Sequence, residues 1–331
     1  MKLRVAVVSV SLVLGMSACG TTSSDRGHHQ SPRGTLAGSL LTPRADADAS
    51  GDLSATKAAA PTASATRVVV AGDIACPPGF PVAKTTCRQG ATAALIRTLN
   101  PDLVIPLGDE QYETGSLADF QHSYARSWGS LLSRTYPVPG NHEYYTPGAS
   151  GYYSYFAGRA APAPGYYRIS TNGWQLYLLN SNCNVISCPT EASWLDAEMI
   201  AHPTKCSLIA MHHPRFSSGA EHGSSTVVRG LWTVAYNHHA DVALSGHDHD
   251  YERFARMDPN GSVQPTRGVL EFVAGTGGRS LYPRGATVTG SRYFENTVHG
   301  VLELTLASGQ FSWSFRDIYG KVHDSGTYHC I

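Results

Sequence analysis

The chain has 331 residues, with 25 Lys and Arg against 25 Asp and Glu, and with 15 His. This balanced charge excludes the broad basic surface that nucleic-acid binding usually needs, so we expect no nucleic-acid partner. With 42% hydrophobic residues the chain is too apolar to be disordered throughout, and it is long enough for one large domain or two small ones.

Residues 1–18 are predicted to form a lipoprotein-type signal peptide. Lys2 and Arg4 precede an apolar run from Val5 to Met16, which is too short to cross a bilayer as a mature helix. The following residues resemble a bacterial lipobox, with Met16 where Leu is usual and with Cys19 as the lipidated cysteine. We expect export and anchorage to the outer face of a bacterial membrane through this lipid alone, with simple secretion as the alternative.

Residues 19–66 are predicted to be a disordered tether. They are rich in Ser, Thr, Ala and Pro and have almost no large apolar side chains, so they cannot bury enough surface to offset chain entropy. The folded catalytic domain is therefore predicted to span residues 67–331.

Six cysteines remain after Cys19, and an even number in an exported protein indicates disulfides. Six cysteines allow fifteen pairings. Proximity in the sequence favours Cys76–Cys87 and Cys183–Cys188, which leaves Cys206–Cys330.

Five short apolar runs predict buried strands, and each run ends at side chains that can bind a metal. A glycine before the polar residue would let the chain turn sharply at four of these ends. The runs and the residues after them are 67–72 before Asp73, 102–108 before Asp109, 136–140 before Asn141 and His142, 207–211 before His212 and His213, and 242–246 before His247, Asp248 and His249.

Four segments between these strands carry apolar residues at helical spacing: 88–99, 116–133, 190–201 and 225–237. Ser116 and Thr190 are suitable N-caps for two of them. Alternating strands and helices predict an α/β domain, in which functional sites lie beyond the carboxyl ends of the strands.

Carboxylates, an amide and imidazoles without thiolates suit Zn, Mn or Fe. One carboxylate can bridge two ions, and two ions can clamp an in-line displacement at phosphorus, with a shared hydroxide as the nucleophile. Such a site needs no Ser or Cys nucleophile. The glycine-rich segment 275–278 lacks the Lys of a phosphate-binding P-loop and is predicted to be an ordinary loop.

The five blocks, in this order, resemble those of calcineurin-like metallophosphoesterases. Tyr112, three residues after Asp109, makes the sequence similar to the purple acid phosphatases, and so does the run from Gly246 to Arg253. The first block departs from the family pattern, because Ala75 stands where Gly or His is usual. The length is that of the small single-domain form.

The resemblance implies two metal ions that share Asp109. A phenolate ligand favours Fe(III) at the first site, and a divalent Zn, Mn or Fe is expected at the second. The first ion would be held by Asp73, Asp109, Tyr112 and His249, and the second by Asp109, Asn141, His212 and His247.

The resemblance also suggests two catalytic histidines. His142 would stabilise the phosphate or protonate the leaving oxygen, and His222 would contribute to leaving-group protonation. His213, next to a ligand on a strand, is expected to support the site without binding a metal.

Further strands are predicted at 268–274, 300–306 and 310–316, which would complete a second sheet. Together with the resemblance they imply a four-layer αββα sandwich, with two central sheets flanked by helices, in a single catalytic domain.

The expected function is hydrolysis of small phosphomonoesters by a metal-dependent, acid phosphatase-like enzyme. The alternatives are a phosphodiesterase or nucleotidase with the same metals, or a non-catalytic phosphate- or metal-binding lipoprotein. The sequence leaves the natural substrate and the oligomeric state open.

Overall fold

The computed structural model describes residues 65–331. The predicted signal peptide and nearly all of the predicted tether lie outside the described residues. Between residues 65 and 331, no helix is long and apolar enough to cross a membrane.

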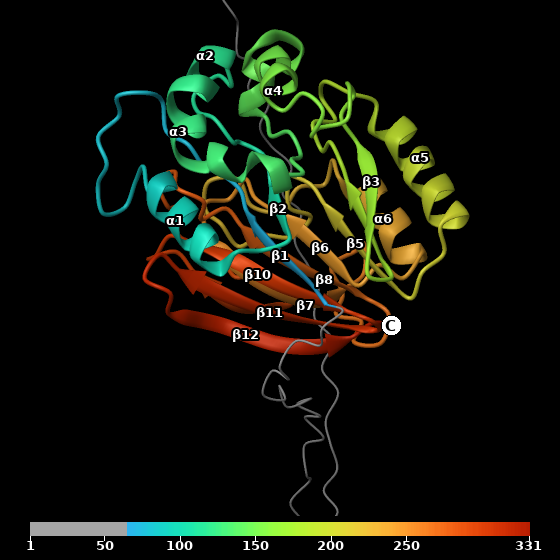
Figure 1. Ribbon diagram of the computed structural model, residues 1–331. Helices are drawn as coiled ribbons and strands as arrows, with labels where there is room; N and C mark the ends of the chain where they lie inside the picture. Colours follow the sequence, from blue (N-terminus) through green and yellow to red (C-terminus); the bar gives the residue numbers. More distant parts are fainter. Residues whose placement is uncertain (1–64) are drawn as a thin grey trace, which may run out of the picture. The chain divides into compact units, whose positions relative to one another are not determined.

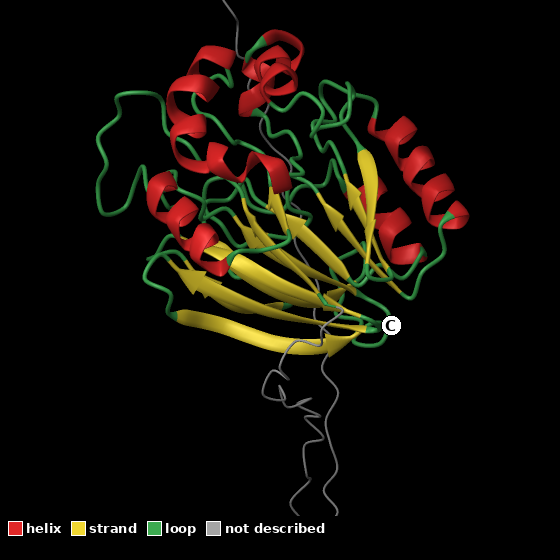
Figure 2. Cartoon of the chain, viewed as in Figure 1, coloured by secondary structure: helices red, strands yellow, loops and turns green. Residues whose placement is uncertain are grey.

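Two mixed β-sheets form the centre of the domain (Figure 2). The first sheet has the strand order β12-β11-β10-β1-β2, and the second has the order β3-β4-β5-β6-β8-β7-β9. The strands of the first sheet are β1 (Thr66–Ala71), β2 (Leu103–Pro106), β10 (Gly300–Ala307), β11 (Gln310–Asp317) and β12 (Val322–His329). Those of the second are β3 (Tyr167–Thr171), β4 (Trp174–Leu178), β5 (Cys206–Ala210), β6 (Val242–Ser245), β7 (Tyr251–Met257), β8 (Val269–Ala274) and β9 (Ser291–Glu295).

Helical segments cover the outer faces of both sheets (Figure 1). The α-helices are α1 (Gln89–Leu99), α2 (Leu117–Asp119), α3 (Ala125–Ser127), α4 (Ser150–Tyr155), α5 (Cys188–Ala201) and α6 (Arg229–Asn237). The short π and 3-10 segments are η1 (Phe120–Tyr124), η2 (Trp128–Arg134), η3 (His142–Tyr145) and η4 (Pro147–Ala149).

The alternation of side chains along β1 explains the layering. Val68 and Val70 lie in the core between the two sheets, whereas Val69 and Ala71 pack against α1 and the helical segments 117–134. On the far side of the second sheet, Trp232 of α6 belongs to a separate buried cluster. The predicted four-layer αββα sandwich is therefore confirmed.

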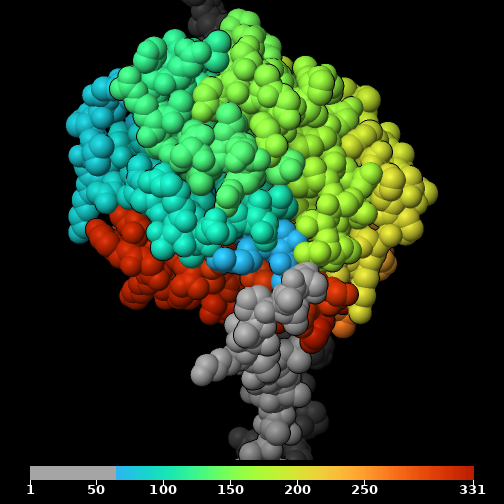
Figure 3. Space-filling view, viewed as in Figure 1, coloured from blue at the N-terminus to red at the C-terminus, as the bar shows by residue number. Residues whose placement is uncertain are grey.

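The first sheet joins distant parts of the chain. β1 pairs in parallel with β2 and antiparallel with β10, so the red C-terminal strands lie beside the blue-green segment (Figure 3). In the second sheet β4, β5, β6 and β8 are parallel. Their carboxyl ends meet at one edge, which is where the expected ligands lie.

Most predicted elements are present, with ends shifted by a few residues. The strand predicted at 136–140 is wrong: this region makes only isolated bridges, Thr135 with Val104 and Val138 with Leu107. Pro137 and Pro139 explain the difference, because proline has no N–H to donate to a ladder.

Two helix predictions need correction. Residues 116–133 form a chain of short segments, α2, η1, α3 and η2, instead of one helix. Ser116 caps α2 as predicted, since its side chain accepts a hydrogen bond from Asp119 N. The cap of α5 is Ser187 instead of Thr190: Thr190 N donates to the Ser187 hydroxyl, and the helix begins two residues earlier than predicted.

The three disulfides that sequence proximity favoured are confirmed: Cys76–Cys87, Cys183–Cys188 and Cys206–Cys330. The last one closes 124 residues and ties the C-terminus to the start of β5. Ile331 N also donates to Asp241, so the last residue is held by a hydrogen bond as well.

Candidate metal centre

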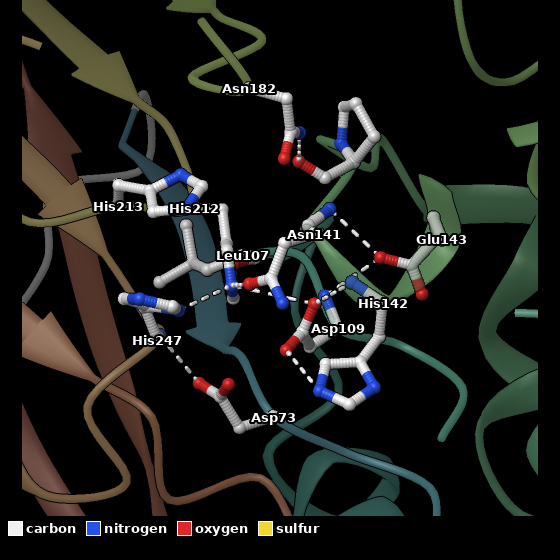
Figure 4. Close-up of polar contacts among 12 residues, drawn as sticks. Asp73, Leu107, Asp109, Asn141, His142, Glu143, Asn182, His212, His213 and His247 are labelled. Carbon is white, nitrogen blue, oxygen red and sulfur yellow. Dashed lines mark hydrogen bonds and ion pairs between the residues drawn. The ribbon is translucent and has the colours of Figure 1, made fainter. Parts of the chain in front are cut away.

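The seven predicted metal ligands lie together at the carboxyl ends of the strands. Six of them form two groups, and Asp109 lies between these groups. Figure 4 shows Asp109 together with Asp73, Asn141, His212 and His247. The tyrosine group is Asp73, Tyr112 and His249. The asparagine group is Asn141, His212 and His247.

Short distances define the tyrosine group. The Tyr112 hydroxyl lies 3.0 Å from Asp73 Oδ1 and 2.9 Å from His249 Nε2. It also lies 3.0 Å from Asp109 Oδ2. One hydroxyl proton can satisfy only one of these three acceptors, so the group has an excess of lone pairs.

The asparagine group meets the other oxygen of Asp109. His212 Nε2 lies 3.0 Å from Asn141 Oδ1, 3.1 Å from His247 Nδ1 and 3.4 Å from Asp109 Oδ1. Asp109, His212 and His247 thus offer ligand atoms close enough together to hold one ion. The two oxygens of Asp109 face one group each.

The backbone fixes how two of the histidines face the centre. His212 Nδ1 lies 2.8 Å from Leu107 O, and His249 Nδ1 lies 2.6 Å from Ser280 O. A carbonyl oxygen only accepts, so each Nδ1 carries a hydrogen and each Nε2 points inward, where it offers a lone pair whenever the ring is neutral. At His212 this lone pair faces the oxygens of Asn141 and Asp109, and it repels them unless a cation lies between. The donor set therefore fits a metal.

The electrostatics of the metal-free centre lead to the same conclusion. Burial alone would lower the pKa of His212, but the Asp109 carboxylate outweighs burial and raises this pKa to about 9. Burial alone would raise the pKa of Asp109, but His212 and then His142 and His247 hold it well below its usual range. A proton on His212 thus supplies positive charge when no metal does.

Three of the predicted ligands occupy a backbone conformation that is uncommon for residues other than glycine. Asp73 has φ 61°, Asp109 has φ 48° and His247 has φ 73°, and each lies two or three residues after the end of a strand. The sharp turn is thus made at the ligand itself. The glycines before Asp73 and His247 have no positive φ and serve close packing: a Cβ on Gly246 would lie 2.7 Å from Asp73 Oδ2. Strained positions of this kind cluster at functional sites.

Glu143 holds the backbone around Asp109. Its Oε2 accepts hydrogen bonds from Asp109 N at 2.9 Å and Gly140 N at 2.8 Å, and its Oε1 accepts from Gln111 N at 3.2 Å. Burial raises the pKa of Glu143 to about 7, and the negative charge of Asp109 adds to the shift. Glu143 therefore supports the centre and does not lie in the donor set.

The predicted catalytic histidines lie beside the donor groups. His142 Nδ1 is 2.6 Å from Glu113 O, which leaves Nε2 to face Asp109 Oδ2 at 3.8 Å. His222 is exposed to solvent, and its ring stacks on His247 with 3.9 Å between the centroids.

His213 lies beside the asparagine group. Its Nδ1 lies 2.9 Å from the Ser181 hydroxyl, and its ring centroid lies 4.4 Å from that of His247. Burial, with a smaller contribution from His212, lowers the pKa of His213 to about 3, so this ring is neutral at physiological pH.

Two residues near the centre were missed by sequence reasoning. The ring of Tyr282 stacks on His249 at 3.8 Å, and the Arg279 guanidinium lies 5.0 Å from the centroid of the Tyr112 ring. Both follow the glycine-rich segment after β8, which was predicted to be an ordinary loop. Its position at the carboxyl end of a strand was the only sequence signal for them.

Residues 66–251 match the calcineurin-like phosphoesterase family, and all seven predicted ligands lie in this range. Tartrate-resistant acid phosphatase type 5 of pig (Sus scrofa) is 28% identical over 230 residues, which are 59% of this chain and 66% of that protein. The chain thus spans slightly less than two thirds of this curated relative.

Solved structures share the fold. A purple acid phosphatase from yellow lupin (Lupinus luteus) seeds has a TM-score of 0.67 and 18% identity, covering 81% of this chain and 54% of that one. The anchor protein of the Plasmodium inner membrane complex has a TM-score of 0.58 and 14% identity, covering 81% and 89%. Because that neighbour is described as an anchor, the fold alone does not establish an activity.

We predict that the metal-free protein loses stability as the pH rises from 7 to 10. The pKa of His212 is higher in the folded state than in the unfolded one, so its contribution is complete below about pH 6.5 and is lost as the pH passes about 9. The loss should reach about 3 kcal/mol at most. Urea unfolding at several pH values, on protein whose metals have been removed with a chelator, measures this loss in the free energy of unfolding.

Asp109→Asn should remove this dependence, because the carboxylate that raises the pKa of His212 is gone. The exposed carboxyl variant Asp196→Asn is the control and should keep the dependence. A pH profile that Asp109→Asn leaves unchanged would contradict the Asp109–His212 coupling.

Proposed function

The chain belongs to the calcineurin-like phosphoesterase family, and on this premise we propose that it is a purple acid phosphatase-like enzyme that hydrolyses phosphomonoesters at a dinuclear metal centre. The position of Asp109 is the observation that carries the proposal. Its two oxygens face two donor groups whose lone pairs oppose each other unless cations separate them.

The donor atoms of the two groups differ, and this supports different metals. The tyrosine group offers a phenol, one carboxylate and one imidazole, and its phenol suits Fe(III). The asparagine group offers an amide and two imidazoles, which suit Zn, Mn or Fe(II). Burial, followed by the charges of Asp109 and Asp73, raises the pKa of Tyr112 well above its usual range. Only a strongly polarising ion would therefore take the place of the phenol proton.

The residues on the open side of the centre have distinct roles. When bound, the two cations supply the hydroxide nucleophile and offset the charge of the phosphate. His142, fixed through Nδ1 to Glu113 O, presents Nε2 to a phosphate oxygen. His222, which is exposed and stacked on His247, gives a proton to the leaving oxygen as its bond to phosphorus breaks, so that a neutral alcohol departs.

The decisive assay compares p-nitrophenyl phosphate with bis(p-nitrophenyl) phosphate, because the leaving group is the same. We expect kcat/KM for the monoester to exceed that for the diester by at least about tenfold, since the monoester dianion binds two cations better. Asp109→Asn should abolish turnover, and the exposed control Asp196→Asn should keep it.

Other results of this assay would favour one of the two alternative functions. A preference for the diester would favour a phosphodiesterase or nucleotidase. Phosphate or metal binding without turnover of either ester would favour a non-catalytic binding protein.

Iron-loaded protein should absorb visible light through charge transfer from Tyr112 to Fe(III). Tyr112→Phe should remove the band, because no other tyrosine hydroxyl in the described chain lies among the predicted ligands. Absorption spectroscopy with metal analysis measures this. Tyr282→Phe is the matched control, since Tyr282 stacks on His249 without belonging to the donor set. A band that survives in Tyr112→Phe would contradict tyrosinate ligation.

We also propose that the protein is exported and lipidated on Cys19. Three disulfides support an oxidising compartment, and the signal-like sequence supports the route. In cells treated with globomycin the precursor should accumulate, and mass spectrometry of untreated cells should find a lipid on Cys19. Cys19→Ser is the control without a lipid site, and an unmodified, freely released wild-type chain would contradict the proposal.

A further inference from the structure

We propose that Asp248, between the predicted ligands His247 and His249, is a positioning residue that holds the loop 214–225 so that His222 lies over His247. The inference rests on the proposed function, in which His222 protonates the leaving oxygen. One His-Asp-His segment would then serve two purposes: its histidines face the metals and its aspartate places the acid.

The Asp248 carboxylate is fully buried and accepts hydrogen bonds from the loop. Its Oδ1 accepts from His222 N at 3.2 Å, and its Oδ2 accepts from Gly223 N at 2.9 Å. The Ser217 hydroxyl donates to Oδ2 at 2.5 Å and in turn accepts from Gly219 N at 2.9 Å. One carboxylate thus orders the backbone on both sides of the loop.

The loop packs directly on this carboxylate. A Cβ on Gly219 would lie 2.3 Å from Asp248 Cγ, so only glycine fits at that position. The contact leaves no room for a water layer between the loop and Asp248. The position of the loop therefore depends on the shape and charge of this one side chain.

His222 depends on this backbone for its own position. Among residues 65–331 its side chain makes no hydrogen bond, and only its N–H does, to Asp248. Its ring lies nearly parallel to that of His247, with an interplanar angle of 21° and 3.9 Å between centroids, and it remains exposed. Releasing the backbone at 222–223 would therefore move the ring away from the substrate side of the centre.

Other contacts hold the rest of the loop and provide a matched control. Ser218 donates to Glu252 through both its N–H and its hydroxyl, each at 2.7 Å, and Ala220 N donates to Pro283 O at 3.0 Å. Ser218→Ala removes the hydroxyl bond to Glu252 and the bond that this hydroxyl accepts from Val288 N at 2.9 Å, without touching Asp248 or His222. It should therefore weaken the loop slightly and leave the acid in place.

The first test is hydrogen exchange of the metal-free protein, which needs no activity. Asp248→Asn keeps the size of the side chain but replaces one of its two accepting oxygens with an NH2 group. That group cannot accept from Ser217, His222 or Gly223, which now donate to the carboxylate. The amides of Gly219, His222 and Gly223 should exchange at least about tenfold faster than in the wild type. Ser218→Ala should leave the amides of His222 and Gly223 unchanged, and so would Asp248→Asn if the proposal is wrong.

The second test is a double-mutant cycle on the metal-loaded enzyme with an alkyl and an aryl phosphate. Removing His222 should lower kcat/KM for the alkyl ester, whose leaving group needs a proton, by about a hundredfold, and should affect p-nitrophenyl phosphate little. Asp248→Asn should lower the alkyl rate by at least about tenfold, with unchanged metal content. In a His222→Ala background, Asp248→Asn should cause no further loss.

The proposal is overturned if Asp248→Asn lowers both rates equally, if the two losses multiply in the double variant, if the metal is lost, or if His222→Ala has no effect. A wild-type enzyme that hydrolyses no phosphomonoester would instead overturn the proposed function. Hydrogen exchange would still decide whether Asp248 anchors His222, so the two failures are distinguishable.

Discussion

The structure depends on bringing Lewis-basic side chains together against their mutual repulsion. At the Asp109 carboxylate, the lone pairs of His212, Asn141 and Tyr112 converge within about 3.5 Å of its oxygens or of one another. Without a positive charge this arrangement is unfavourable in a buried site. The surrounding chain must therefore hold the donors before a cation arrives, and a proton on His212 compensates in the meantime.

Buried carboxylates that accept backbone amides provide this support. Glu143 holds the segments around Asp109, Glu191 accepts from Asn180 N after β4, and Glu271 accepts from the two amides that follow Pro214. Burial raises the pKa of Glu143 to about 7 and those of the other two to about 8. These acids thus bear a desolvation cost so that the ligand loops keep one conformation.

The site could be predicted from the sequence wherever a buried apolar strand is followed closely by a polar side chain, because both features are local. Asp73 and His247 follow apolar runs whose burial the structure bears out. Predictions failed where local and tertiary signals conflict: Pro137 and Pro139 break a run that looks like a strand, and the polar edge strand β12 lacks an apolar pattern. The positions of Tyr282 and Arg279 beside the centre depend on long-range packing that no local pattern records.

The two donor groups draw on both sheets, and this couples metal binding to the packing of the sandwich. Asp73 and Asp109 follow strands of the first sheet, whereas His212, His247 and His249 follow strands of the second. An ion held by both sets binds only when the sheets are packed, so it stabilises the native state by mass action. The apolar core between the sheets is complete without it. The core thus sets the distance between the two halves of the centre, and the bound cations would reinforce a geometry that the core already provides.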